Sequence, residues 1–269
     1  MLVEFTKMSG AGNDFVLIDN RAGRVRLTTD QVRRLCDRHR GVGADGVLLL
    51  APCASGRADW AWEFYNSDGS AAEMCGNGAR CFARFIQRVA GATGQTTFET
   101  GAGVITARFE GERVTVNLTP PKDLRLDQRL VVGGQKLTVH SINTGVPHVV
   151  VFVADADQAM VESLGRELRF HAAFAPQGTN VNFVQVLAPG RIRVRTYERG
   201  VEQETLACGT GVTAAALIAS RVHGFGSPVA VQVQSGDTLE VAFQSERKGF
   251  RDVFLTGPAE FVFEGRIEL

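Results

Sequence analysis

The sequence lacks an excess of charge of either sign, since 29 lysines and arginines balance 29 aspartates and glutamates among its 269 residues. Binding to nucleic acid or to an anionic membrane depends on an excess of basic residues, so neither partner is expected. No stretch comes near the roughly 20 apolar residues that a membrane-spanning helix needs. Residues 1–7 lack the basic stretch and long apolar segment of a secretory signal. We therefore expect a cytoplasmic protein.

The sequence also lacks the cysteine pattern of a secreted, disulfide-linked protein. Its cysteines are odd in number and irregularly spaced, at positions 36, 53, 75, 81 and 208. No C-x-x-C or H-x-x-x-H spacing accompanies them, so a zinc site is not expected. The thiols are therefore predicted to be reduced and available for chemistry.

Short apolar or alternating runs, separated by glycine and proline, predict many short strands. In the first part of the chain they fall at 2–8, 14–19, 47–51, 60–66, 96–100, 103–109 and 113–118. In the second part they fall at 137–142, 148–154, 181–187, 191–197, 229–234, 238–243, 252–256 and 260–263. Helices are predicted at 29–39, directly after Cys75, and at 211–222. Pro120-Pro121 is the expected boundary between a first domain, 1–119, and a second, 120–260, with a strand at 261–269 that can return to the first.

An internal repeat links the two parts. Residues 75–79 read Cys-Gly-Asn-Gly-Ala and residues 208–212 read Cys-Gly-Thr-Gly-Val, each just before the main helix of its part. The helix after Cys208 is apolar on nearly every side, as expected of a helix enclosed by its own sheet. Two similar halves predict an approximate two-fold relation in which the two Cys-Gly turns face each other.

The Cys-Gly-x-Gly turn suits proton transfer at a carbon next to a carboxylate. The first turn of a helix presents free N–H groups and a partial positive charge, which bind anions and favour the thiolate form of cysteine. Glycines let a ligand approach the backbone. Two facing turns would place a sulfur on each side of one carbon atom, so that one thiolate removes a proton and the opposite thiol returns one. This predicts a racemase or epimerase that works without a cofactor.

Less specific interpretations of the cysteines stand beside this one. Free cysteine is often a buried packing residue, and we assign that role to Cys36, Cys53 and Cys81, which lack the glycine frame. Cys75 and Cys208 could also bridge on oxidation, in which case we expect the oxidised form to be inactive.

The chain resembles the diaminopimelate epimerase family over nearly its whole length. The resemblance lies in several motifs in the right order: residues 10–15, 38–45, 65–70, 74–81, 177–183, 197–200 and 207–211. It implies an α/β (α+β) fold of two pseudo-symmetric domains, each a barrel-like mixed sheet around a central helix. It also implies interconversion of LL- and meso-2,6-diaminopimelate without pyridoxal phosphate or metal, in lysine and peptidoglycan precursor biosynthesis, by a homodimer.

The resemblance implies a role for each matching residue. The acid and base are Cys75 and Cys208. The reacting carboxylate is bound by Gly76, Asn77, Gly209 and Thr210. The distal amino-acid end is bound by Asn13, Asn66, Asn180, Glu198 and Arg199. The residues that tune the thiols are His148 and Glu198. An ammonium and a carboxylate at the distal end call for an anion, a cation and amides, which this set contains.

Two positions depart from the family pattern. Many members have glutamine where this chain has Gly46 and asparagine where it has Val146, so two polar substrate contacts are absent or supplied by Asn143 or Thr144. Two rival functions use the same fold. A proline or hydroxyproline racemase has a similar thiol pair, but its substrate has no second amino-acid head to occupy the distal residues. A binding protein related to phenazine biosynthesis would not need both cysteines.

Overall fold

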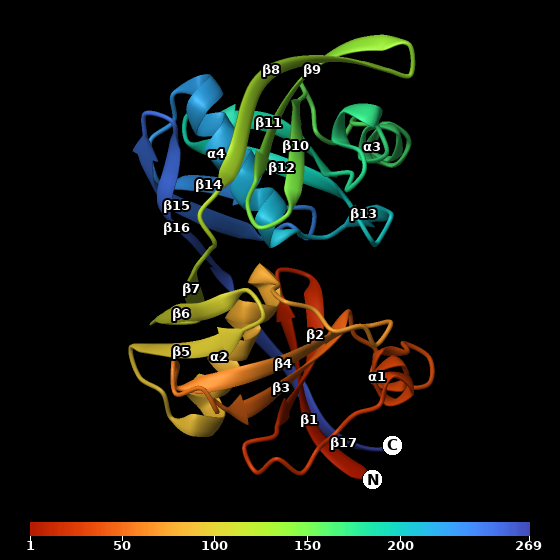
Figure 1. The fold of residues 1–269 in the computed structure, drawn as a ribbon, viewed down its shortest axis with the longest axis vertical. Helices are drawn as coiled ribbons and strands as arrows, with labels where there is room; N and C mark the ends of the chain where they lie inside the picture. The colour runs from red at the N-terminus through yellow and green to blue at the C-terminus, as the bar shows by residue number, and fades with distance from the viewer. The chain divides into compact units, whose positions relative to one another are not determined.

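The computed structural model describes residues 1–269, which form two compact units (Figure 1). The first unit comprises Met1–Asn117 with Gly257–Leu269, and the second comprises Leu118–Thr256. The observed boundaries differ from the predicted ones by a few residues. Residues 118–119 belong to the second unit and not to the first, and residues 257–260 belong to the first unit and not to the second. The strand β16 ends at Pro258 and β17 begins at Glu260, so the returning segment joins the first unit a few residues before that strand begins.

In the first unit the chain forms one mixed sheet. Its strands are β1 (Leu2–Gly10), β2 (Asn13–Asp19), β3 (Gly46–Pro52), β4 (Trp60–Asn66), β5 (Gln95–Thr100), β6 (Gly103–Glu110), β7 (Arg113–Asn117) and β17 (Glu260–Glu268). They pair in the order β17-β1-β2-β3-β4-β5-β6-β7. The pairs β2/β3 and β4/β5 are parallel and the others antiparallel. The two parallel connections contain the helices α1 (Thr29–Cys36) and α2 (Gly76–Ala90), as parallel neighbours require a crossover.

In the second unit the same pattern recurs. The strands are β8 (Lys122–Val132), β9 (Gln135–Asn143), β10 (Pro147–Phe152), β11 (Asn180–Ala188), β12 (Arg191–Glu198), β13 (Gln203–Thr205), β14 (Val229–Gln232), β15 (Thr238–Glu246) and β16 (Gly249–Pro258). The order is β8-β9-β10-β11-β12-β14-β15-β16, parallel only at β10/β11 and β12/β14, with the short β13 also paired to β12. The parallel connections contain α3 (Val161–Arg169), followed by the 3-10 turn Ala172–Phe174, and α4 (Gly209–His223). The sequence of parallel and antiparallel neighbours is therefore identical in the two units.

The sheet of each unit surrounds one helix and carries a second on its outside (Figure 1). The helix α2 contacts β1, β2, β3, β5, β6 and β7, and α4 contacts β9, β10, β11, β12, β14 and β15. In β3, Val47 and Leu49 pack towards α1, whereas Leu48 lies beside the first turn of α2. The strand is thus buried on both faces, which explains its continuous apolar sequence. The predicted fold class, a mixed sheet around a central helix in each of two similar units, is confirmed.

The predicted central helices are also confirmed. Both follow a cysteine in an extended conformation and end at a left-handed glycine, Gly91 with φ 69° and Gly224 with φ 71°, a conformation that only glycine adopts without strain. Nearly all of α4 from Gly209 to Ser220 is buried, as its apolar sequence predicted. It begins at Gly209, two residues earlier than expected. None of the helices is long and apolar enough to cross a membrane.

Three elements were missing from the sequence prediction. The strand β8 is mostly exposed, and two of its aspartates, Asp123 and Asp127, have positive φ where its register with β9 shifts, so it shows no apolar alternation. The helix α3 has a glycine in its interior, which lowers its helix propensity. A Cβ atom at Gly165 would lie 2.6 Å from the Tyr197 Cβ, so packing against β12 requires this glycine. The strand β13 is only three residues long.

Candidate active site

The two repeated cysteines occupy equivalent places in the two units. Cys75 is the N-cap of α2 with φ −145° and ψ 121°, and Cys208 is the N-cap of α4 with φ −119° and ψ 108°. Each thus precedes the enclosed helix, in the second parallel crossover of its sheet. The amides of Gly76 and Gly209 begin the first turns, where unpaired N–H groups and the helix dipole favour an anion. Each unit therefore presents a thiol at the start of a helix, where the backbone geometry favours an anion.

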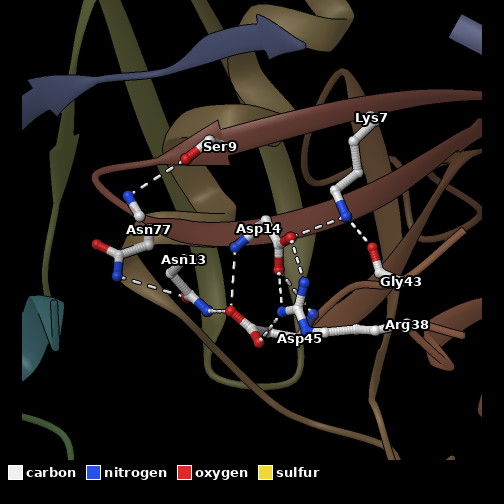
Figure 2. Close-up of polar contacts among 9 residues, drawn as sticks. Lys7, Ser9, Asn13, Asp14, Arg38, Gly43, Asp45 and Asn77 are labelled. Atoms are coloured by element: carbon white, nitrogen blue, oxygen red, sulfur yellow. Dashed lines mark hydrogen bonds and ion pairs between the residues drawn. The ribbon is translucent and has the colours of Figure 1, made fainter. Parts of the chain in front are cut away.

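Cys75 lies against Asn13 in the turn between β1 and β2. The thiol donates to the Asn13 Oδ1 at 3.6 Å, and the Gly78 N–H donates to the sulfur at 3.4 Å. The Asn13 Nδ2 donates to the Asp45 carboxylate at 2.5 Å, which can only accept. Asp45 therefore fixes the amide of Asn13 with its oxygen towards Cys75 and Asn77, whose Nδ2 donates to it at 3.4 Å (Figure 2).

Behind Asn13 lies a network of charged side chains (Figure 2). Arg38 donates two hydrogen bonds to Asp14, at 3.0 and 2.9 Å, and one to Asp45 at 2.9 Å. The Lys7 ammonium lies 2.8 Å from Asp14 and also donates to the Gly43 carbonyl. Burial raises the pKa of Asp14, but the hydrogen bonds and charges of Arg38 and Lys7 outweigh it, and its pKa lies below the ordinary 3.8. This network anchors the turn that carries Asn13. No role was predicted for these charged residues, although Asp14, Arg38 and Asp45 lie in motifs that resemble those of the family.

The start of α2 is held by a buried arginine. Arg80 is fully buried, and its guanidinium donates to the Asn77 Oδ1 at 3.0 Å and to the carbonyls of Gly76, Gly10 and Pro258 at 3.2, 3.3 and 3.1 Å. Asn77 is itself buried. One side chain thus ties the first turn of α2 to the end of β1 and to the segment leading into β17.

Cys208 is approached by a different set of groups. The Thr210 Oγ1 lies 3.5 Å from its sulfur, and the His148 Nε2 lies 2.9 Å from that same hydroxyl oxygen. Thr210 also accepts, at its carbonyl, a hydrogen bond of 2.9 Å from the Thr144 hydroxyl. His148 is 1% exposed, and burial, with a smaller contribution from the charge of Arg199, lowers its pKa to about 3. The imidazole next to Thr210 is therefore neutral at physiological pH.

The burial of neutral His148 makes stability depend on pH. Below pH 6.5 the unfolded chain binds a proton there that the folded chain does not take up until about pH 3. Because the pKa of His148 is lower in the folded state than in the unfolded state, neutral His148 does not reduce the free energy of unfolding above pH 6.5. Below that pH the free energy of unfolding falls by about 1.4 kcal/mol per pH unit. We expect His148→Gln to reduce the pH dependence of the urea midpoint between pH 7 and 5. Equal slopes in the variant and the wild type would contradict the buried, neutral state.

The remaining predicted substrate residues of the second unit gather at the ends of β11 and β12. The Asn180 Oδ1 accepts from the Arg199 N–H at 2.9 Å, and its Nδ2 donates to the Pro147 carbonyl at 2.9 Å. The Arg199 guanidinium donates to the Gln177 carbonyl at 3.1 Å. The Glu198 carboxylate accepts from the Thr205 hydroxyl at 2.9 Å. Asn180, Glu198 and Arg199 are thus brought together with His148, which is the strand neighbour of Asn180.

The Asn66 side chain is held by its own turn. Its Nδ2 donates to the Ser70 hydroxyl at 3.1 Å and its N–H to the Ser70 carbonyl, and its backbone lies beside Gly46 in the register of β3 and β4. At Gly46 a Cβ atom would lie 2.7 Å from the Tyr65 carbonyl oxygen, which leaves no room for a larger side chain in this backbone position. Of the residues expected to compensate, Asn143 accepts from the Gly145 N–H within its turn, and Thr144 is already bound to Thr210.

The other cysteines differ from the repeated pair. Burial raises the pKa of both Cys36 and Cys81 to about 12, which makes them inert packing residues as predicted. The same prediction is wrong for Cys53, which is partly exposed in the loop after β3 and donates to Glu99 at 3.2 Å. Nowhere do three or more histidine, cysteine or acidic side chains gather in a way that could hold a metal ion.

This fold is shared with known epimerases and their relatives. A phenazine biosynthesis protein of the PhzF family from Bacillus anthracis has a TM-score of 0.76 at 16% identity, with both chains covered in full. A hydroxyproline epimerase from Agrobacterium vitis, solved with trans-4-hydroxy-L-proline, has a TM-score of 0.74 at 17% identity, covering 100% of this chain and 93% of that one. At such low identity these likenesses establish the fold alone. The chain therefore has the fold of these proteins, with a cysteine at the start of the enclosed helix in each of its two units.

Comparison with known sequences identifies the family to which the chain belongs. The family model described as diaminopimelate epimerase matches residues 5–124 and 140–262. The diaminopimelate epimerase of Aquifex aeolicus is 47% identical over 277 residues, which span 98% of each chain. The chain belongs to the diaminopimelate epimerase family and is an isomerase of the epimerase type.

Proposed function

We propose that the chain interconverts LL- and meso-2,6-diaminopimelate by moving an α-proton between Cys75 and Cys208, without pyridoxal phosphate. The observation that carries this proposal is the equivalence of the two thiols, each the extended N-cap of the enclosed helix in one of two units with the same strand order. Diaminopimelate is the substrate named for relatives such as the Aquifex aeolicus enzyme. Inverting a stereocentre requires one proton carrier on each face, and a repeated thiol supplies that pair.

The chemistry balances without a further reactant. One cysteine, as thiolate, takes the α-proton and becomes a thiol, leaving a carbanion whose charge extends into the carboxylate. The other cysteine, as thiol, returns a proton to the opposite face and becomes the thiolate. The first-turn amides around Gly76, Asn77, Gly209 and Thr210 stabilise the charge that develops on the carboxylate. Each turnover exchanges the protonation states of the two sulfurs.

The distal amino-acid end needs recognition of an ammonium and a carboxylate. We assign it to Asn13, Asn66, Asn180, Glu198 and Arg199. The Arg199 guanidinium supplies the cation and Glu198 the anion, while the asparagine amides both donate and accept. We assign His148 and Glu198 to adjusting the reactivity of the thiols. By analogy with the family, we place this reaction in lysine and peptidoglycan precursor synthesis, carried out by a cytoplasmic homodimer.

The proposal is tested by turnover of LL-diaminopimelate in D2O without added pyridoxal phosphate. We expect meso product that carries one solvent deuterium at the inverted carbon, while unreacted substrate initially carries none, because the proton comes from a second, opposed thiol. Added pyridoxal phosphate should not change the rate. L-Proline and trans-4-hydroxy-L-proline serve as control substrates. Racemisation of either without diaminopimelate turnover would refute the substrate, and a requirement for pyridoxal phosphate would refute the mechanism.

A further inference from the structure

Asn182 in β11 connects the buried side of α4 to His148. Its side chain is completely buried, and its Nδ2 donates to the Val149 carbonyl at 2.9 Å and lies 3.3 Å from the His148 Nδ1. Its Oδ1 accepts from the Thr196 hydroxyl at 3.0 Å. A Cβ atom at Gly211 would lie 2.4 Å from this Oδ1, so the amide fills the space directly beneath the first turn of α4.

These contacts determine the direction of each hydrogen bond. The Val149 carbonyl can only accept, so the nitrogen of the Asn182 amide must face it. The second hydrogen of the same NH2 group then points at the His148 Nδ1, which must accept. A neutral imidazole whose Nδ1 accepts carries its proton on Nε2. The His148 Nε2–H therefore donates to the Thr210 oxygen, which leaves the Thr210 hydroxyl hydrogen to be donated to the Cys208 sulfur, 3.5 Å away.

The first unit provides an internal comparison. The strand registers pair Phe15 with Gly46 and Leu48 with Phe64, just as they pair His148 with Asn180 and Asn182 with Thr196. The first-unit equivalents of His148, Asn182 and Thr196 are therefore Phe15, Leu48 and Phe64.

All three equivalents are apolar and buried, and a Cβ atom at Gly78 would meet Phe15 at 3.4 Å and Leu48 at 3.5 Å. The space beneath the first turn of α2 is thus hydrophobic, whereas the space beneath α4 holds a directed hydrogen-bond chain. The shared fold does not need polar groups there. Their presence beneath α4 therefore points to a purpose at Cys208.

We propose that Asn182 is a positioning residue that holds His148 in its Nε2–H form, so that Thr210 presents a hydroxyl hydrogen to Cys208 and stabilises its thiolate. The proposal rests on the proposed function only in that Cys208 is taken as a proton carrier. Hydrogen bonds to charged groups are stronger than those between neutral groups. The row of hydrogen bonds from Asn182 through His148 and Thr210 therefore favours the ionised Cys208 sulfur over the thiol. Its effect is confined to one of the two thiols.

The first test measures alkylation by iodoacetamide as a function of pH, with Cys75 and Cys208 followed separately by peptide mass spectrometry. We expect Asn182→Leu, which installs the first-unit residue, to lower the rate at Cys208 near neutral pH about tenfold and to move its pH profile to higher pH. Cys75 in the same molecules is the internal control and keeps its wild-type rate. A Cys208 rate within about twofold of wild type in the folded variant would overturn the proposal.

A second pair of variants tests the hydrogen bond next to the sulfur. Thr210→Ser keeps the hydroxyl and should keep the wild-type pH profile of Cys208 alkylation. Thr210→Val keeps the shape of the side chain without the hydroxyl and should shift this profile to higher pH, as Asn182→Leu does. A purely structural role would lower the stability of Asn182→Leu without separating the serine and valine variants. Equal Cys208 profiles in these two variants would overturn the proposal.

A third test uses only the wild-type protein, so it does not depend on whether any variant folds. The ¹⁵N chemical shifts of His148 distinguish the two neutral tautomers, and we expect the Nε2–H form. An Nδ1–H form would overturn the proposal. Neither alkylation nor NMR needs a substrate, so a failure to turn over diaminopimelate would refute the proposed function and leave this inference to be decided by its own results.

Discussion

Replacement of either Cys75 or Cys208 by alanine is expected to lower epimerisation at least about 10³-fold, because each variant lacks the only proton carrier on one face of the substrate. The assay is conversion of LL- to meso-diaminopimelate under a reducing agent. Neither variant should lose the fold, since Cys208 makes no side-chain cap hydrogen bond and Cys75→Ala removes only the weak one from the Gly78 N–H to the sulfur, at 3.4 Å. Circular dichroism and thermal unfolding check this point.

Cys53 offers the matched control for the cysteine variants. It is partly exposed, and it lies outside both helix starts in the loop after β3. We expect Cys53→Ser to retain wild-type turnover, which would show that general loss of an accessible thiol is harmless. Near-normal epimerisation by Cys75→Ala or Cys208→Ala would end the two-thiol mechanism.

Replacement of Arg80 by methionine is expected to lower the free energy of unfolding by about 3–5 kcal/mol. The guanidinium is fully buried and serves four acceptors, three of them backbone carbonyls. Methionine fills much of the same space but leaves those acceptors without this donor. Urea unfolding should show a lower midpoint with little change in slope, because the surface exposed on unfolding stays similar.

Arg88, on the same helix, is the control for the Arg80 variant. Its side chain is 46% exposed and pairs with Glu264 at 3.0 Å. Exposed pairs of this kind contribute about 0.2–1 kcal/mol, so Arg88→Met should move the midpoint only slightly. If Arg80→Met were as stable as Arg88→Met, the hydrogen bonds of the buried guanidinium would not hold the start of α2 in the way we describe.

The part of the fold that the sequence predicts is the part set by local pattern. The central helices are recognisable because an apolar segment is preceded by Cys-Gly and ended by Gly91 or Gly224. The strand β8 and the helix α3 are not predicted from the sequence, because contacts with neighbouring strands stabilise them and their local sequence pattern does not. In α3 the interior Gly165 is favourable only in contact with Tyr197, a residue that follows it by more than thirty positions.

The candidate site divides in the same way. The repeated frame marks Cys75 and Cys208, but Asn182, Arg80 and Asp45 act through contacts that only the folded chain makes. Asn182 did leave a signal, since it interrupts the apolar strand between Val181 and Phe183. A polar residue at such a position is costly unless it is hydrogen-bonded, and its partners are the Val149 carbonyl, the Thr196 hydroxyl and His148.

The returning strand β17 has a consequence for how the polypeptide matures. The second unit is one uninterrupted segment, whereas the first is split and β1 gains its outer neighbour only when β17 arrives. During translation Leu118–Thr256 can fold while the earlier segment still presents β1 as an open edge, a state that invites pairing with other chains. Released chains that end at residue 256 should therefore be protease-resistant in the later-synthesised unit and sensitive in the earlier one, which reverses the usual order of N-terminal folding first.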